Sequence, residues 1–380
     1  MDIENLQNEI DNIDKDIVSL LNKRMAISKK IAQTKVENNL PLRDVSKERQ
    51  KMNEVIDMSE EDLKDYMSVL YSMIFDVTKS YQSTFIAKNS DITSNIENAM
   101  EKTDKIFPQH AKVACQGVEG ANSQIACDKL FRNANITYYK SFEGVFKAIE
   151  NGECRYGIVP VENSIAGSVN SAYDLMSKHN FKIVRSIRLK IDHNLLVKPG
   201  TKLEDIREIY SHEQAINQCS EFLGSLKDVK VIPCENTAIA AKRVSLSDRN
   251  DVAAIASRAC ISLYNLSSLK ESIQNTDNNY TRFICISKEL EIYPGASKTS
   301  VMLTLPHEPG SLYKILSRFY ALGVNLIKLE SRPLPNREFE FMFYFDLETS
   351  VYTKGLLSLL DELSMICDNF TYLGSYNEVI

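Results

Sequence analysis

Apolar positions in the first part of the chain repeat with the period of an α-helix. They recur at alternating steps of three and four, as on one face of a helix in a coiled coil or bundle. These seam positions are Ile3, Leu6, Ile10, Ile13, Ile17, Leu20, Ile27 and Ile31. The seam corresponds to about 45 Å of helix at 1.5 Å per residue, and Pro41 ends it. Shorter helices are predicted over residues 44–58 and 61–85. Two short helices cannot bury so long a seam, so we expect a dimer that shares helices.

The pattern changes after residue 88. Residues 89–110 are polar, have no sustained apolar stripe and are predicted to be a linker. From 111 to 287, short apolar runs alternate with helical stretches, which predicts helices layered on a sheet. Residues 299–376 are predicted to run strand, helix, strand, strand, helix, strand, which is the ferredoxin-like order. We therefore expect a multidomain protein with an all-α region at 1–88, an α/β region and an α+β region.

Composition narrows the class of protein. The 380 residues are 43% hydrophobic and 25% charged with a net charge of -6, which gives no electrostatic reason to expect nucleic acid or membrane as partner. The eight cysteines form no CxxC, the five histidines have no zinc-ligand spacing, and nucleotide-binding glycine motifs are absent. We expect no metal and no cofactor. The first residues have no secretory signal and no apolar run approaches a membrane span, so a cytoplasmic protein with free thiols is expected.

A cation interrupts the helical seam. Arg24 occupies an apolar seam position, and Lys35 follows eleven residues later, about three turns on, so both project from one face. A basic surface edge is the alternative, but a buried guanidinium needs an anionic partner. The polar positions that complete a pocket on the next two predicted helices are Asp44, Glu48, Thr78 and Gln82. Such a pocket suits a small dicarboxylate that carries a hydroxyl group.

These residues lie in segments that resemble a known family. LLNKRMAISKKIAQTK and PLRDVSKER are similar to the all-helical chorismate mutases, and the resemblance covers residues 3–83. It implies that Arg24 and Lys35 hold carboxylate and ether oxygens and that Gln82 binds the breaking ether oxygen. It also implies that the ring hydroxyl and a carboxylate of the substrate are bound by Asp44, Glu48 and Thr78.

One position departs from that family. Gln7 stands where the family usually has an arginine that reaches across the dimer to a substrate carboxylate, and glutamine brings no charge. A dehydratase that keeps a weakened mutase domain for dimerisation is therefore an alternative to a bifunctional enzyme.

Three motifs in the central region lie at the ends or starts of predicted strands. They are GVEGANS (117–123), VPVENSIAGSVNSAYDL (159–175) and NNYTRF (278–283). Turns rich in Gly, Asn and Ser expose amide groups that collect anions, although each alone is ordinary capping chemistry. Together with YSHEQAINQCSEFL and ENTAIAA they resemble prephenate dehydratase over 111–287, which implies two lobes with the site between them.

The resemblance assigns roles to these motifs. Thr281 would protonate or hydrogen-bond the departing hydroxyl of prephenate, and it needs a polarising neighbour because threonine is a poor acid. Residues that would orient the substrate are Ser123, Asn163, Ser164 and Thr237. Glu162 and His212 would bind the substrate or brace the loops. Arg282 is a substrate cation or, as we favour, a structural ion pair.

The last region resembles the amino-acid-binding ACT domain. The similarity lies in LPHEPGSLYKIL (305–316) and NLIKLESRP (325–333), and it implies phenylalanine as an inhibitory effector. The implied effector-binding residues are Gly310, Ser311, Leu312, Asn325, Glu330, Ser331 and Arg332. A ferredoxin-like domain used only for dimerisation is the alternative.

The three resemblances together predict a bifunctional enzyme of phenylalanine biosynthesis. It would convert chorismate to prephenate and then prephenate to phenylpyruvate, CO2 and water, as a homodimer or higher homo-oligomer inhibited by phenylalanine. A ligand-sensing regulatory protein is a competing class, because two-lobed α/β domains and ACT domains both occur in sensors. The intact catalytic motifs and the lack of a DNA-binding segment favour the enzyme.

Overall fold

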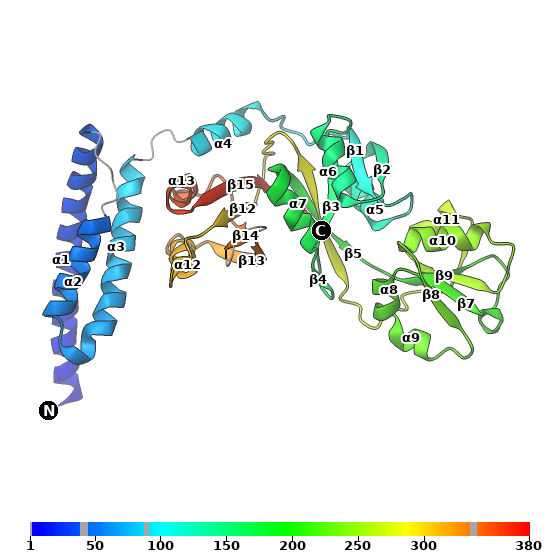
Figure 1. Ribbon diagram of the computed structural model, residues 1–380, viewed down its shortest axis with the longest axis horizontal. Helices are drawn as coiled ribbons and strands as arrows, with labels where there is room; N and C mark the ends of the chain where they lie inside the picture. The colour runs from blue at the N-terminus through cyan, green and yellow to red at the C-terminus, as the bar shows by residue number, and fades with distance from the viewer. Residues whose placement is uncertain (1, 39–44, 87–90, 335–339) are drawn as a thin grey trace. The chain divides into compact units, whose positions relative to one another are not determined.

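The computed structural model describes residues 2–38, 45–86, 91–334 and 340–380 (Figure 1). The chain divides into two compact units. The first consists of Met1–Asn95, Pro306–Val324 and Tyr352–Asp368, and the second of Ile96–Leu305, Asn325–Val351 and Asn369–Ile380. None of the described helices is long and apolar enough to cross a membrane. All eight cysteines are free thiols.

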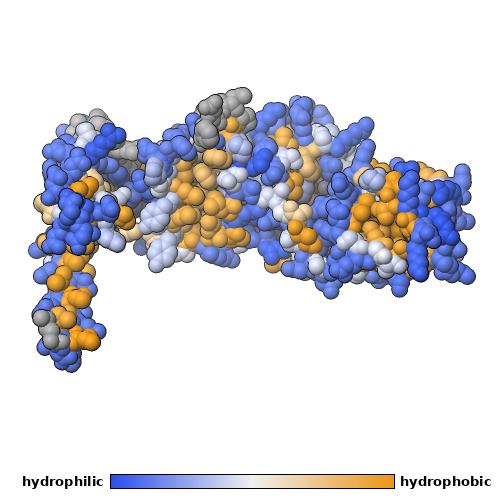
Figure 2. Space-filling model, turned by 60° about the horizontal axis from the view of Figure 1, so that its bottom comes forward, coloured by the Kyte–Doolittle hydropathy of each residue, from blue (hydrophilic) through white to orange (hydrophobic). Residues whose placement is uncertain are grey.

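The first unit contains the predicted helical region. Its helices are α1 (Ile3–Glu37), α2 (Val45–Met58) and α3 (Lys64–Ile86), with the 3-10 turn η1 (Glu61–Leu63) before α3. The lack of glycine in this region favours such long helices. The apolar seam of α1 is largely uncovered in the single chain: Ile3 is 71% and Ile10 57% exposed. Figure 2 shows apolar side chains along this helical region. A seam of this kind needs a partner.

Two further helices belong to the first unit. They are α12 (Ser311–Ala321) and α13 (Leu356–Ile366). The Arg318 Nε in α12 donates to the Glu362 Oε1 in α13 at 2.6 Å, and both side chains are buried. This ion pair joins the two helices.

The expected linker contains a helix. Helix α4 (Asp91–Lys102) occupies much of residues 89–110, where the polar sequence showed no sustained apolar stripe. Ile92, Ile96, Ala99 and Met100 repeat at helical spacing, and Ile96 and Ala99 are buried. A stripe only three turns long is easily missed among polar residues.

The first lobe of the second unit is built on a mixed sheet of seven strands. They are β1 (His110–Gln116), β2 (Asn133–Tyr139), β3 (Tyr156–Asn163), β4 (Gly167–Ser168), β5 (Lys182–Lys190), β11 (Tyr280–Ser287) and β16 (Glu378–Val379). The order is β16-β5-β11-β3-β1-β2, with β4 paired to β3. Its helices are α5 (Asn122–Leu130), α6 (Phe142–Glu150) and α7 (Asn170–His179). Val159 packs in the core with α6 and α7, and Ile158 packs in the core with α5, so the sheet is buried on both faces.

The second lobe carries a five-stranded sheet in the order β10-β6-β9-β7-β8. Its strands are β6 (Asn194–Val197), β7 (Glu208–Ser211), β8 (Lys230–Pro233), β9 (Val252–Ala256) and β10 (Ser267–Lys270). Its helices are α8 (Glu213–Gln218), α9 (Ser220–Gly224), α10 (Thr237–Leu246) and α11 (Ala259–Leu263), with the 3-10 turn η2 (Leu203–Asp205). The chain leaves the first lobe after β5 and returns at β11, as Figure 1 shows. The predicted two-lobed α/β architecture is confirmed.

The C-terminal sheet completes the second unit. Its strands are β12 (Lys298–Thr304), β13 (Asn325–Pro333), β14 (Phe341–Glu348) and β15 (Asn369–Tyr376). They pair antiparallel in the order β13-β14-β12-β15. The elements follow one another along the chain as predicted, and this strand order is the one that a ferredoxin-like sheet has.

Candidate active sites

A cavity of about 490 Å³ lies in the second unit and is lined by residues of both lobes. The sequence-predicted residues among its lining are Ser123, Asn163, His212, Thr237 and Thr281. Glu162 and Ser164 are not part of the described lining. The Ser164 hydroxyl instead donates to the Asn278 carbonyl at 2.8 Å and accepts from the Tyr280 N–H at 2.9 Å, which braces the loop before β11.

A β-bulge aims Asn163 into this cavity. In the pairing of β3 with β11, Arg282 lies opposite Glu162 but Phe283 lies opposite Pro160, so Val161 is an extra residue. Such an insertion shifts the alternation of side chains along the strand. Pro160 and Asn163 consequently line the cavity, whereas Glu162 points to the opposite face of the sheet. The prediction that Glu162 touches the substrate is not supported by this placement.

A side-chain amide lies beside the hydroxyl of Thr281 and donates a hydrogen bond to it. The Asn163 Nδ2 donates to the Thr281 Oγ1 at 2.9 Å, and the two residues are register partners on adjacent strands. The Asn163 Oδ1 accepts the N–H groups of Ile165 and Ala166 at 3.1 and 2.9 Å, which fixes the orientation of the amide. Because Thr281 accepts a hydrogen bond from the amide, its own hydrogen can be donated into the cavity.

The hydrogen bonds continue behind this pair through residues that sequence reasoning missed. Asn163 Nδ2 also donates to the Asn279 Oδ1 at 2.9 Å, and Asn279 Nδ2 donates to the Gln218 Oε1 at 2.9 Å. The same Gln218 oxygen lies 2.8 Å from the His193 Nε2. Burial lowers the pKa of His193, which favours the neutral ring. Asn279 and Gln218 lie within NNYTRF and YSHEQAINQC, so the motifs already contained them.

Helix N-termini surround the cavity in place of cationic side chains. The residues at or beside the starts of α5, α7 and α10 that line it are Ala121, Asn122, Ser123, Val169, Asn236 and Thr237. No lysine or arginine occurs in the described lining. Amide groups and the helix dipole at these ends favour an anionic ligand. Across the described residues, no cluster of three or more His, Cys, Asp or Glu could hold a metal ion.

Arg282 lies outside the described lining of the cavity and contacts two carboxylates and one hydroxyl. Its guanidinium contacts the carboxylate of Asp346, donates to the Tyr376 hydroxyl at 2.7 Å and lies 3.2 Å from the Glu378 Oε1. Burial alone would lower the pKa of Arg282, but Tyr376 and Asp346 outweigh it and raise this pKa above its ordinary value. The structure thus favours the ion-pair interpretation of Arg282.

The helical region brings its predicted residues onto facing helices. Arg24 of α1 donates to the hydroxyl of Thr78 in α3, and one turn further the Gln82 Nε2 donates to the Ser28 carbonyl at 3.0 Å. From the first contact to the second, the residue numbers increase by four in both helices, so α1 and α3 run parallel here. Burial lowers the pKa of Arg24 from its ordinary value.

The remaining residues predicted for the helical site lie at different distances from this pair of contacts. Glu48 of α2 pairs with Lys79 of α3 at 2.8 Å, a cation that sequence reasoning missed. Lys35 is half-buried near the end of α1, and Asp44 lies outside the described residues. Gln7 is exposed and lies seventeen residues before Arg24, about 25 Å along the helix, so it cannot reach the contact of Arg24 with Thr78 in its own chain.

The predicted effector residues fall on two elements. Gly310, Ser311 and Leu312 begin α12, where Gly310 has a φ of 81° that only glycine adopts readily. Those on β13 are Asn325, Glu330, Ser331 and Arg332. Glu330 contacts the Ser168 hydroxyl, and Arg332 makes two hydrogen bonds of 2.9 Å to Asp174 of α7.

Taken together, the fold and the sites define a class of enzyme that joins a helical bundle, in which Arg24 contacts Thr78, to a two-lobed α/β domain with Thr281 in the lining of its cavity. Comparison with known families agrees. Residues 6–83 match the chorismate mutase type II family and residues 113–291 match the prephenate dehydratase family. A bifunctional chorismate mutase/prephenate dehydratase of Aquifex aeolicus is 31% identical over 381 residues, covering 100% of this chain and 99% of that protein. The chain belongs to the bifunctional chorismate mutase/prephenate dehydratase family.

Solved structures share the fold of a large part of this chain. Prephenate dehydratase from Arthrobacter aurescens, solved in complex with L-Phe, has a TM-score of 0.64 and 28% identity, covering 70% of this chain and 89% of that one. GqqA, described as a novel type of quorum quenching acylase, has a TM-score of 0.64 and 29% identity, covering 70% of this chain and 97% of that one. Because one fold carries differently described activities, the function of this chain must be argued from its site.

Proposed function

We propose that this chain converts chorismate to prephenate in the helical bundle and prephenate to phenylpyruvate, CO2 and water in the cleft. The observation that carries the second activity is the contact between Asn163 and Thr281, which leaves the threonine hydrogen available to a substrate oxygen. Family membership supports both activities.

In the cleft, the two bonds that break belong to the same ring. The electron pair of the bond to the ring carboxylate enters the ring as CO2 departs, the ring becomes aromatic, and the hydroxyl leaves from the opposite carbon. One proton is consumed, since the departing oxygen must become water. Thr281 donates a hydrogen bond to that oxygen, and Asn163 makes the donation stronger by polarising the threonine hydroxyl. Ser123, Thr237 and the adjacent helix N-termini bind the carboxylates.

In the bundle, no proton needs to move, because the rearrangement of chorismate is pericyclic. The protein must hold the compact conformer and stabilise the charge that develops on the ether oxygen. Arg24 and Gln82 lie one helical turn apart along the interface of α1 and α3, which suits donors to a carboxylate and to that ether oxygen. Lys35, Glu48 and Thr78 complete the proposed pocket.

The C-terminal region is proposed to be an ACT domain that binds phenylalanine. The strand order of its sheet and the L-Phe complex of the Arthrobacter relative support this assignment. Titration calorimetry with phenylalanine tests it: saturable binding is expected, and its absence would leave the region with a role in dimerisation only.

Thr281→Ala tests the dehydratase site. We expect phenylpyruvate formation from prephenate to be lost while the consumption of chorismate continues at the normal rate. The mutase activity of the same chain controls for folding. Dehydration that continues in this variant would contradict the assignment of Thr281.

A further inference from the structure

Strands β3 and β11 are neighbours in the first-lobe sheet. On each of them, one residue faces the cavity and the adjacent residue faces the opposite side of the sheet. Thr281 of β11 and Asn163 of β3 are register partners and line the cavity. Arg282 and Glu162 are the next register partners, and their side chains lie on the other face. We call Arg282 and Glu162 the rear pair. Contacts that hold the rear pair in place also hold the adjacent backbone of Thr281 and Asn163.

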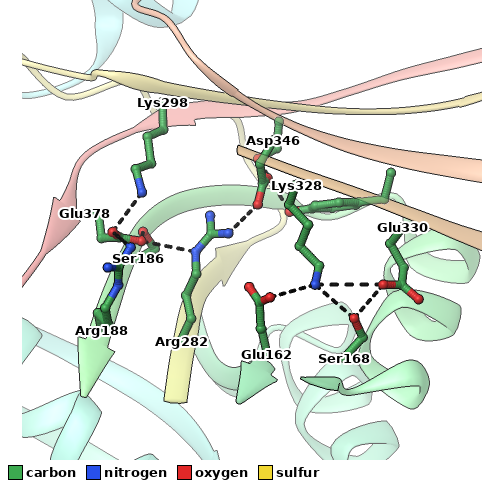
Figure 3. A network of polar contacts seen from close by, with 12 residues as sticks. Glu162, Ser168, Ser186, Arg188, Arg282, Lys298, Lys328, Glu330, Asp346 and Glu378 are labelled. Atoms are coloured by element: carbon green, nitrogen blue, oxygen red, sulfur yellow. Dashed lines mark hydrogen bonds and ion pairs between the residues drawn. The ribbon is translucent and has the colours of Figure 1, made fainter. Parts of the chain in front are cut away.

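The C-terminal sheet supplies an oppositely charged partner to each residue of the rear pair (Figure 3). The Lys328 Nζ on β13 lies 2.9 Å from the Glu162 Oε1. Asp346 on β14 contacts the guanidinium of Arg282. The side chains of Arg282 and Asp346 are 6% and 0% exposed, so their contact is shielded from solvent, whereas the largely buried Lys328 side chain (11% exposed) meets a Glu162 side chain that is 37% exposed.

Lys328 touches both strands of the hairpin that carries Asn163. Besides Glu162 of β3, its Nζ donates to the Ser168 Oγ of β4 at 2.9 Å. Glu162 and Ser168 are register partners in this hairpin, and the next pair is Asn163 with Gly167. Figure 3 shows the ammonium group between Glu162, Ser168 and Glu330. The ammonium group of Lys328 thus contacts the hairpin at the residue pair next to Asn163, whose amide polarises Thr281.

We propose that Lys328 is a positioning residue for dehydration, acting through Glu162 and Ser168 without touching the substrate. The proposal rests on the proposed roles of Thr281 and Asn163. Catalytic groups must be held within about 0.5 Å of their productive geometry, and a misplacement of about 1 Å can cost on the order of 10²-fold in rate. Loss of Lys328 should therefore lower kcat for prephenate and leave KM nearly unchanged, because neither Lys328 nor Glu162 belongs to the described lining of the cavity.

Lys328→Met is the appropriate variant, since it keeps an unbranched apolar stem and removes the charge. Asp346 is a poorer choice, because its removal would leave the buried guanidinium of Arg282 without a main partner. Glu162 retains a side-chain exposure of 37%, so water can hydrate it when the lysine is gone. We expect kcat to fall about tenfold with KM within about twofold, and Lys328→Arg to recover most of the rate. The matched control is Lys354→Met, which removes an exposed lysine of the C-terminal region and should leave dehydration unchanged.

A double-mutant cycle with Glu162→Gln completes the test. The two substitutions should each lower kcat, and the double variant should be no slower than Lys328→Met, because they remove one contact. The inference is overturned if Lys328→Met keeps kcat within about twofold of the natural chain, or if the two effects multiply. If Lys328→Met also loses mutase activity through misfolding, Glu162→Gln alone decides: a lower kcat supports the inference and an unchanged kcat overturns it.

Thr281→Ala, assayed in parallel, separates this inference from the proposed function. Turnover that persists in Thr281→Ala contradicts the proposed site itself. An inactive Thr281→Ala beside a fully active Lys328→Met contradicts only the role of Lys328.

Discussion

Asn163→Asp isolates the polarising hydrogen bond, because it changes one nitrogen to oxygen and hardly changes the shape of the side chain. Asn163 is buried, and its Oδ1 contacts to Ile165 and Ala166 survive the substitution. The ionised aspartate cannot donate, so the bonds from Nδ2 to Thr281 and Asn279 are lost. Removing one preorganised donor from an active site costs about 10²–10³ in kcat, or about 2.7–4 kcal/mol. We expect a loss of that size in prephenate turnover.

The assay is the appearance of phenylpyruvate from prephenate, with chorismate consumption by the same sample as the folding control. A protonated aspartic acid can donate one hydrogen bond and can thus restore the contact to Thr281. The activity of Asn163→Asp relative to the natural chain should therefore rise as the pH falls, since burial beside an anionic substrate raises a carboxyl pKa. A variant whose kcat stays within about threefold of the natural value at neutral pH would refute the polarising role of Asn163.

Three further predictions concern the mutase site, the assembly and acid stability. Gln7→Arg should lower KM for chorismate by about tenfold, the effect of one charge-assisted hydrogen bond; unchanged kinetics would show that position 7 does not meet the substrate. We infer from the uncovered seam that the natural chain is a dimer. Ile10→Asp should then give a monomer in light scattering, because it places a charge in the seam, whereas the neighbouring Asn8→Asp should keep the mass of the dimer. A monomeric natural chain, or an unchanged mass of Ile10→Asp, contradicts a dimer formed through α1. Burial lowers the pKa of His193 in the folded protein. The neutral ring therefore contributes fully to stability above about pH 6.5, the ordinary histidine pKa of the unfolded chain. This contribution is lost as the pH falls toward the folded-state pKa. His193→Gln should flatten the fall in Tm below that pH, and the exposed His110→Gln should not; parallel Tm curves for all three proteins would exclude His193 as a source.

The sequence predicted the elements well where the pattern was long or the motif was specific. The seam of α1 extends over eight positions and few breakers interrupt it, so its helical period is unambiguous. Thr281 and Asn163 were found through TRF and ENS. Helix α4 was missed because its stripe is short, and Lys79 was missed because a lysine on a helix surface has no distinctive signal.

The position of Glu162 shows where a strand pattern cannot be followed from sequence. Strict alternation would place Asn163 with Val161 in the core and Glu162 with Pro160 at the cavity. The extra residue Val161 reverses this arrangement after Pro160, and the bulge exists only in relation to the partner strand β11. A contact that depends on two strands more than a hundred residues apart leaves no local signal in either of them.

The two sites receive related dicarboxylates and meet them with different electrostatics, and the reactions explain the difference. The mutase reaction keeps both carboxylates, so a cation such as Arg24 can hold the substrate throughout without opposing the chemistry. The dehydratase reaction expels one carboxylate as CO2, and that group loses its charge in the transition state. An ion pair with it would stabilise the substrate more than the transition state and would raise the barrier. Neutral donors such as Ser123 and Thr237 at helix N-termini bind anions more weakly than a cation does. They therefore raise the barrier to the loss of the carboxylate charge less than a cation would. The absence of lysine and arginine from the described lining of the cleft agrees with a site from which a carboxylate leaves as CO2.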